Sequence, residues 1–180
     1  MARNKSDVAD AIKEHILAKE LFENHQTVQA LTQLYLQKGE RDLRIAYANL
    51  GMGKKESNLM QASFFVWSIV IGYYSMFHSA RAALAKIKIQ FSNRKVHEAL
   101  INAMYHYYVY PGVLDKKLFY MLESAKEMRD KSLELMEKLE DARDKRGNLN
   151  YQVAKSVSER EAAELLRNAT EFNEAMKKLS

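Results

Sequence analysis

The sequence predicts an all-α protein, an antiparallel four-helix bundle with a shorter C-terminal helix and an added N-terminal helical arm. Three observations support this prediction. Only 6 glycines and 1 proline interrupt the 180 residues, so long helices are allowed. Apolar residues recur at three- and four-residue steps along most of the chain. Residues 64–84 begin as a segment without a polar face, which indicates a helix inside a bundle.

A first amphipathic helix is expected to begin after Ser6. Helical spacing resumes at Val28 after a break near Asn24, and Gly39 and Gly51 interrupt the pattern again. We therefore expect a separate short helix between these two glycines. The apolar face of the first helix consists of Ile12, Ile16, Leu17, Leu21 and Phe22. This pattern divides the chain into an N-terminal helical extension, residues 1–40, and a helical bundle, residues 41–180.

The apolar segment belongs to a central helix expected at about residues 58–88. Its longest apolar run, residues 64–77, is 14 residues long, whereas a membrane span needs about 20. The first residues also lack the apolar core of a signal peptide. We therefore expect a cytoplasmic protein without a membrane partner. With 0 cysteines, disulfides and thiolate chemistry are excluded.

Three further helices are expected after the central one. The first, at about 95–108, has an aromatic end and stops before Pro111. The second, at about 114–142, has the three- and four-residue steps of helices packed nearly antiparallel or parallel. The last helix begins where Ser158 precedes Glu161 by three positions, a capping box.

No metal or cofactor is expected from the motifs. A di-iron bundle needs glutamates with histidine three positions later, and no glutamate in this chain has one. The zinc-protease pattern is also missing, since His97 and Glu98 are not followed by a second histidine three positions on. The GMGKKES segment at 51–57 lacks the start and strand context of a phosphate-binding loop.

One candidate site lies on the central helix. Tyr74, His78 and Arg81 are four and three residues apart, so their side chains are expected along one side. A lone histidine in a helix is more often a satisfied core or surface residue than a functional one. Its tyrosine and arginine neighbours favour a functional cluster here.

A second candidate site follows the long helix and is rich in cations. Guanidinium groups bind phosphate with two hydrogen bonds, and amides and hydroxyls supply more. The alternative is that these cations only stabilise the helix end through its dipole, worth about 0.3–1 kcal/mol. The net charge of +5 suits an anionic partner such as RNA. The residues of this site are Arg143, Lys145, Arg146, Asn148, Asn150 and Tyr151.

Several segments together resemble one family, the HEPN superfamily, in its prokaryotic branch of small all-helical proteins. YYSMFHSARAAL at 73–84 resembles the YYAMFHAA-type signature, and RGNLNY at 146–151 resembles an Arg-x-x-x-Asp-Tyr element. VSEREAAELLRNATEFNEAM at 157–176 is similar to the acidic last helix. SNRKVHEAL at 92–100 resembles a Ser-Lys-Lys-His stretch, with His97 at the matching place. The resemblance covers about residues 41–178.

This resemblance implies a homodimer with its arginine-containing loops near the dimer axis. Many relatives are metal-independent ribonucleases that act as toxins or defence effectors, and others are partners of a nucleotidyltransferase. In the ribonucleases an arginine is followed after four to six residues by a catalytic histidine. Here all 5 histidines precede Arg146, and Tyr151 stands where the histidine would be. Tyrosine, with a pKa near 10, is a poor general base, so His78 is the alternative.

The leading hypothesis is therefore a dimeric HEPN-domain protein that binds RNA or a nucleotide, in a toxin–antitoxin or defence pair with a nucleotidyltransferase. The binding residues would be Arg143, Lys145, Arg146, Asn150, Tyr74 and Arg81. One alternative is a metal-independent endoribonuclease whose catalytic residues are Arg146, Tyr151 and His78. The other alternative is a non-catalytic helical interaction module.

Overall fold

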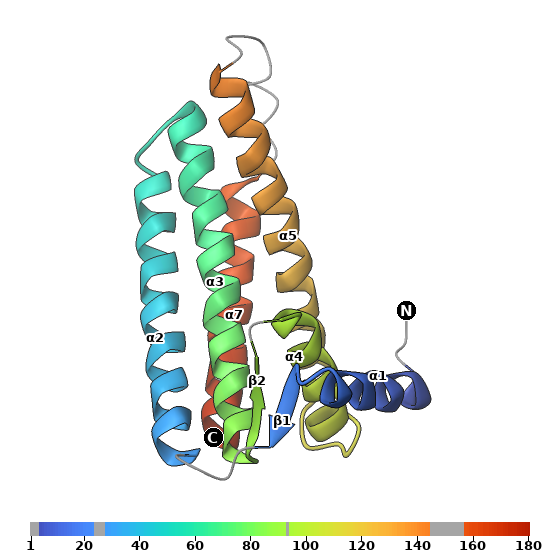
Figure 1. Ribbon diagram of the computed structural model, residues 1–180. Coiled ribbons are helices and arrows are strands. Elements are labelled where there is room, and N and C mark those ends of the chain that lie inside the picture. Colours follow the sequence, from blue (N-terminus) through green and yellow to red (C-terminus); the bar gives the residue numbers. More distant parts are fainter. Residues whose placement is uncertain (1–3, 24–27, 93, 145–156) are drawn as a thin grey trace.

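Four long helices lie side by side and alternate in direction, which confirms the antiparallel helical bundle (Figure 1). The computed structural model describes residues 4–23, 28–92, 94–144 and 157–180. Helix α3 lies between α2 and α5, with α7 behind it (Figure 1). The bounds of the four helices are α2 Val28–Gly53, α3 Asn58–Lys86, α5 Lys116–Asp144 and α7 Glu159–Leu179.

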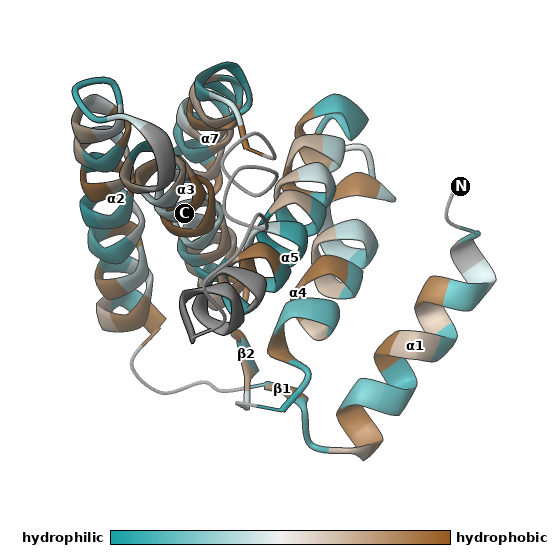
Figure 2. Cartoon of the chain, turned by 90° about the horizontal axis from the view of Figure 1, so that it is seen from above, coloured by the Kyte–Doolittle hydropathy of each residue, from teal (hydrophilic) through white to brown (hydrophobic). Residues whose placement is uncertain are grey.

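The N-terminal arm is the helix α1 (Lys5–Leu17), which stands apart from the bundle beyond α4 (Figure 2). A short antiparallel ribbon follows it, in which β1 (Leu21–Glu23) pairs with β2 (Ile89–Phe91). This ribbon ties the segment after α1 to the segment after α3. It was not expected from the sequence.

Helix α4 (Val96–Met104) continues into a π-helical turn, η1 (Tyr105–Val109). Together they form the helix expected at about 95–108. The hydroxyl of Tyr108 donates a 2.6 Å hydrogen bond to the carbonyl of Ala83, which fixes this turn against α3. Helix α1 packs on α4 and η1.

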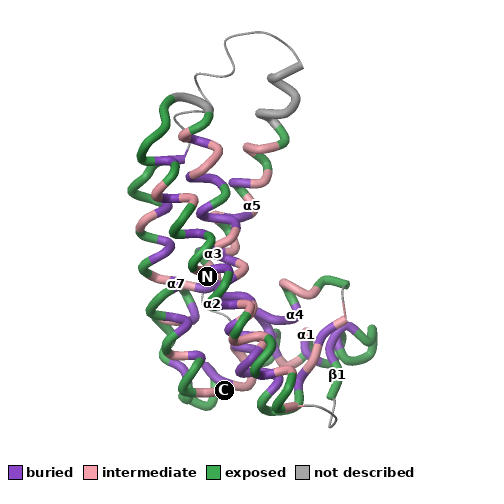
Figure 3. Tube along the Cα trace, turned by 90° about the vertical axis from the view of Figure 1, so that its left-hand side faces the viewer, coloured by how far each residue is buried: buried purple, intermediate pink, exposed green. Residues whose placement is uncertain are grey.

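The core is built around α3, as its apolar sequence predicts. Buried residues follow the sides of the helices that face one another, and exposed residues follow the outer sides (Figure 3). Tyr73, Met76 and Leu84 of α3 are fully buried. By length and composition, residues 60–86 of α3 would suffice for a membrane span. Because 61% of the apolar window is buried inside the bundle, α3 is consistent with the core helix of a soluble protein.

The expected interruption of α2 at Gly39 is wrong, because α2 continues through it. Gly39 is buried against α3, and a Cβ atom there would lie 2.5 Å from Oγ of Ser79. The hydroxyl of Ser75 donates a 2.7 Å hydrogen bond to the carbonyl of Gly39. The glycine therefore serves close helix packing instead of ending a helix. As a result, the division expected after residue 40 falls inside α2, and residues 28–40 pack in the bundle.

The capping box at the start of α7 is confirmed. Oγ of Ser158 accepts from the backbone N–H of Glu161 at 3.2 Å, and the Glu161 carboxylate accepts from the backbone N–H of Ser158 at 2.8 Å. Further along α7, the amide of Asn173 donates to Oγ of Ser75 at 2.6 Å. Since Ser75 also bonds to Gly39, one buried polar network joins α2, α3 and α7.

Candidate functional site

One side of α3 carries Tyr74, His78 and Arg81, as predicted. Residues of α2 pack beside them and complete the candidate site. The ring of His78 stacks on that of Tyr35, with centroids 6.2 Å apart and an angle of 8° between planes. The guanidinium carbon of Arg81 lies 4.3 Å from the Tyr35 ring centroid, a cation–π contact. We call Tyr35, Lys38, Asp42, His78 and Arg81 the Arg81 cluster.

Positive charge dominates the Arg81 cluster. The ammonium of Lys38 lies 5.8 Å from the centroid of the Tyr35 ring, the same ring that Arg81 contacts. The only carboxylate in the cluster, that of Asp42, already pairs with Arg41 at 2.8 Å. Neither Lys38 nor Arg81 forms an ion pair with a carboxylate within the described ranges. The cluster can therefore attract an anion.

His78 is neutral at neutral pH. Its pKa is lowered to about 4, mainly by burial, with a contribution from the neighbouring cations and against the opposing effect of Asp42. Nε2 of His78 lies 3.6 Å from a carboxylate oxygen of Asp42, which is close enough for electrostatic attraction but too long for a hydrogen bond. A neutral imidazole beside a carboxylate has the protonation state that a general base requires.

A second group, the His97 cluster of Tyr73, His97, Arg129 and Asp130, links α3, α4 and α5. Nδ1 of His97 lies 2.7 Å from the Tyr73 hydroxyl, and Nη1 of Arg129 lies 3.2 Å from Nε2 of His97. Because a guanidinium can only donate, this pattern assigns Nε2 as acceptor and Nδ1–H as donor to Tyr73. Arg129 also pairs with Asp130 and lies 4.9 Å from the Tyr73 ring centroid.

Burial sets the protonation of this cluster too. It is the main cause that lowers the pKa of His97 to about 4, and Arg129 and Lys126 contribute to the same shift. It also raises the pKa of the Tyr73 hydroxyl well above its ordinary value. His97 and Tyr73 are therefore both neutral at neutral pH. Arg129 contacts His97 through Nη1 and Asp130 through Nη2, so it acts as an internal link between helices.

Two aromatic rings of α3 join the clusters. The Phe77 centroid lies 4.7 Å from that of His97 and 5.5 Å from that of His78. The Tyr74 centroid lies 5.8 Å from His97 and 6.4 Å from His78. The two histidines thus flank the same pair of rings.

Three buried nitrogen atoms in these clusters have no hydrogen-bond partner among the described residues. They are Nδ1 of His78, Nε of Arg81 and Nε of Arg129. A buried polar group in a purely structural cluster is normally satisfied, and unsatisfied groups are a recognised feature of functional sites. The nitrogens of His78 and Arg81 belong to residues three positions apart on one helix.

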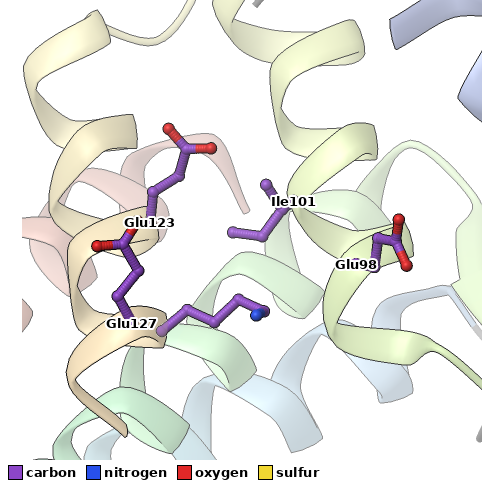
Figure 4. A pocket seen from close by; sticks show the side chains of 5 residues that line it. Glu98, Ile101, Glu123 and Glu127 are labelled. Carbon is purple, nitrogen blue, oxygen red and sulfur yellow. The ribbon is translucent and has the colours of Figure 1, made fainter. Parts of the chain in front are cut away.

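A cavity of about 320 Å³ opens between α4 and α5, beside the His97 cluster. In it Ile101 lies between Glu98 on one side and Glu123 and Glu127 on the other (Figure 4). The fifth lining residue is Lys126, whose ammonium pairs with Asp130 at 2.9 Å. Within the part of the chain that the structure describes, no group of three or more acidic or histidine side chains could hold a metal ion.

The second predicted site lies outside the described residues. Arg143 is in the last turn of α5, and its side chain is not described. No atom of the remaining cationic and polar residues of that site is described. A joint role of His78 and Arg146 therefore stays a prediction. The remaining residues of the site are Lys145, Arg146, Asn148, Asn150 and Tyr151.

The sequence did not reveal the residues that α2 and α5 contribute. Tyr35, Lys38 and Asp42 are three and four positions apart, so they could have been placed on one helical face. That this face meets His78 depends on how α2 packs against α3. No local sequence pattern marks Arg129, because its role depends on contacts with two other helices.

Fold and site together define an all-helical bundle protein with a basic, aromatic and histidine-containing cluster on its central helix. No protein-family model, curated protein or solved structure matches the chain.

Proposed function

We propose that this protein is a cytoplasmic HEPN-like protein that binds RNA or a nucleotide through the Arg81 cluster. The supporting observation is Arg81, a partly buried guanidinium that rests on Tyr35 without a carboxylate partner within the described ranges. Stacking on a ring holds the guanidinium while leaving donors for phosphate oxygens. By contrast, Arg41 and Arg129 are each paired with an aspartate. The cationic residues 143–151 would extend this surface.

The resemblance of residues 73–84 and 146–151 to HEPN proteins supplies the proposed biological setting. It is a toxin–antitoxin or defence pair in which a nucleotidyltransferase is the protein partner. Co-purification of the chain with a nucleotidyltransferase encoded nearby would support this setting. Isolation of a different protein partner with no nucleic acid would instead support the non-catalytic interaction module.

A homodimer fits the outer side of α3. Met60, Trp67, Tyr74 and Arg81 follow one another at intervals of seven residues, so they lie along one line of the helix. Met60 is 57% exposed and Trp67 is 43% exposed, unusual values for large apolar residues of a core helix. A second copy packed against the first half of α3 would cover Met60 and Trp67.

The homodimer can be tested by light scattering and tryptophan emission. Trp67 is the only tryptophan of the chain, so its emission reports on this face alone. Association should shift the emission to shorter wavelength as concentration rises, and Trp67→Glu should give a folded monomer. A wild-type mass that stays monomeric at high concentration would contradict the proposal.

Binding is tested by anisotropy with fluorescent single-stranded RNA at several salt concentrations. Arg81→Ala should weaken binding about tenfold and lower the slope of log affinity against log salt by about one. The matched control is Arg167→Ala, which removes an exposed arginine of α7. Equal affinity and slope in wild type and Arg81→Ala would overturn the assignment. Arg146→Ala tests the cationic residues 143–151 in the same assay.

A metal-independent ribonuclease is the second candidate function, favoured by the neutral His78 beside Asp42. In this version His78 takes the proton of the ribose 2′-hydroxyl, and Arg81 or Arg146 holds the phosphate. The test is RNA cleavage in EDTA, with His78→Gln and Tyr151→Phe as variants. If only His78→Gln loses cleavage, His78 has this role. If the wild-type protein in excess does not cleave RNA, the protein binds RNA without catalysis.

A further inference from the structure

We infer a second ligand site, specific for a small oxyanion, at the end of the bundle where α2 begins. A cavity of about 430 Å³ lies there, within the size range of small-molecule sites. It is bounded by the first turns of α2 and by the last residues of α3 and of the chain. Its lining residues are Val28, Gln29, Thr32, Gln33, Lys86 and Ser180.

Thr32 supplies the first argument for a ligand. Thr32 lines the cavity, the residue is only 5% exposed, and its buried hydroxyl has no hydrogen-bond partner among the described residues. A threonine inside a helix commonly donates to the carbonyl four residues earlier, and here that bond is not formed. A buried hydroxyl without a partner is unfavourable, and an oxygen of a bound anion would satisfy it.

Charge supplies the second argument. Lys86 is exposed and forms no ion pair with a carboxylate in the described part of the chain. The beginning of α2 carries the positive end of its helix dipole, and its first turn contains no acidic residue to neutralise that end. Among the described residues no aspartate or glutamate lines the cavity, and the carboxamides of Gln29 and Gln33 can donate further hydrogen bonds.

This site is separate from the Arg81 cluster. The residues that line the cavity include none of the Arg81 cluster. Lys86 follows Arg81 by five positions, about 7.5 Å further toward the end of α3. The inference therefore does not depend on RNA binding, and the two sites can be tested independently.

The test uses the full chain with inorganic phosphate as probe, acetate as a carboxylate probe, and sodium chloride at matched ionic strength. Amide resonances of Gln29 and Thr32, followed by two-dimensional NMR, should shift saturably with phosphate and not with chloride. Saturation by acetate as well would assign the site to oxyanions in general, and saturation by phosphate alone to phosphate groups.

Two variants locate the site. Thr32→Val and Lys86→Ala should each raise the dissociation constant for phosphate about tenfold. Thr32→Val keeps the side-chain shape and removes the unpaired hydroxyl, so its melting temperature without ligand should not fall. Lys55→Ala at the opposite end of α2 is the charge-matched control, and Arg81→Ala should bind phosphate here like wild type. Equal phosphate and chloride responses, or unchanged dissociation constants in both variants, would overturn the inference.

Discussion

The hydroxyl of Tyr73 and Nδ1 of His97 lie 2.7 Å apart, although 24 positions separate the two residues. Tyr73 is buried in the middle of α3, and His97 is in the first turn of α4. Through the second ring nitrogen of His97 the contact continues to Arg129 of α5. A chain of polar contacts thus joins three helices beside the aromatic core.

Tyr73→Phe should destabilise the protein by about 1–2 kcal/mol, because the partly buried N–H of His97 loses its acceptor. Urea unfolding followed by circular dichroism measures the change. Tyr120→Phe, at an exposed tyrosine of α5, is the control and should stay within about 0.5 kcal/mol of wild type. A double-mutant cycle with His97→Leu should give a coupling energy of about 0.5–3 kcal/mol. A coupling energy near zero would mean that the bond does not stabilise the fold.

The free energy of unfolding should fall as the pH is lowered from about 6.5 to about 4. The pKa values of His78 and His97 are about 4 in the folded protein, whereas an unfolded histidine has a pKa near 6.5. Between these values the unfolded state binds more protons, so acid favours it. The contribution is fully present above pH 6.5 and lost below pH 4. Each histidine should account for on the order of 1–3 kcal/mol, allowing for partial exposure.

Urea unfolding at pH 7.5 and pH 5.0 measures this dependence. The double variant His78→Gln/His97→Gln should lose much of the difference between the two pH values, because the two histidines whose pKa burial lowers are then absent. If the double variant and wild type lose equal stability on acidification, these histidines do not carry the effect.

Gly39→Ala and Gly51→Ala should change stability in opposite directions, although both glycines lie in α2. A Cβ atom at Gly39 would lie 2.5 Å from Oγ of Ser79 and 3.1 Å from the backbone oxygen of Ser75, so the helices must move apart. Overpacking of this kind costs about 1–3 kcal/mol. At Gly51 a Cβ atom would meet nothing within 4 Å, so alanine should add about 0.5–1 kcal/mol through helix propensity. Thermal unfolding of both variants tests this, and equal changes would refute the close α2–α3 contact.

His15→Leu should release α1 without unfolding the bundle. Nδ1 of His15 lies 2.8 Å from the Glu20 carboxylate, and Nε2 lies 3.1 Å from the Asn102 amide, all three being buried. Leucine would leave the Glu20 carboxylate buried without this partner, which is strongly unfavourable. Because α1 packs mainly on α4 and η1, the strain is relieved by its detachment.

Hydrogen exchange followed by mass spectrometry measures this release. Peptides from residues 5–17 should exchange faster in His15→Leu, with α3 and α7 unchanged. Lys13→Ala, which removes an exposed ion pair with Asp10, should exchange like wild type. Faster exchange throughout the chain in His15→Leu would show that α1 and the bundle unfold as one unit.

Elements with strong local signals could be predicted from the sequence. The apolar stretch around Phe64 gave α3, and Ser158 with Glu161 gave the start of α7. Gly39 was misjudged because a glycine that ends a helix and one that admits a neighbouring helix look alike in sequence. The three-residue strands β1 and β2 had no periodicity of their own, since their pairing comes from tertiary structure.

The candidate site divides in the same way. Tyr74, His78 and Arg81 belong to one helix, so their common side followed from spacing alone. Tyr35 and Asp42 come from another helix, and placing them requires the register between α2 and α3. The low pKa of His78 arises mainly from burial, a property that no local sequence pattern encodes.

The docking of α1 on a much later helix has a consequence for synthesis on the ribosome. His15 and its contact Asn102 are 87 positions apart. Helix α1 therefore leaves the exit tunnel long before α4, on which it packs, has been synthesised. At about 5–20 residues per second, roughly 4 to 17 s pass before that partner is translated. During this interval the apolar stripe of the nascent helix is unshielded and is a natural target for chaperones.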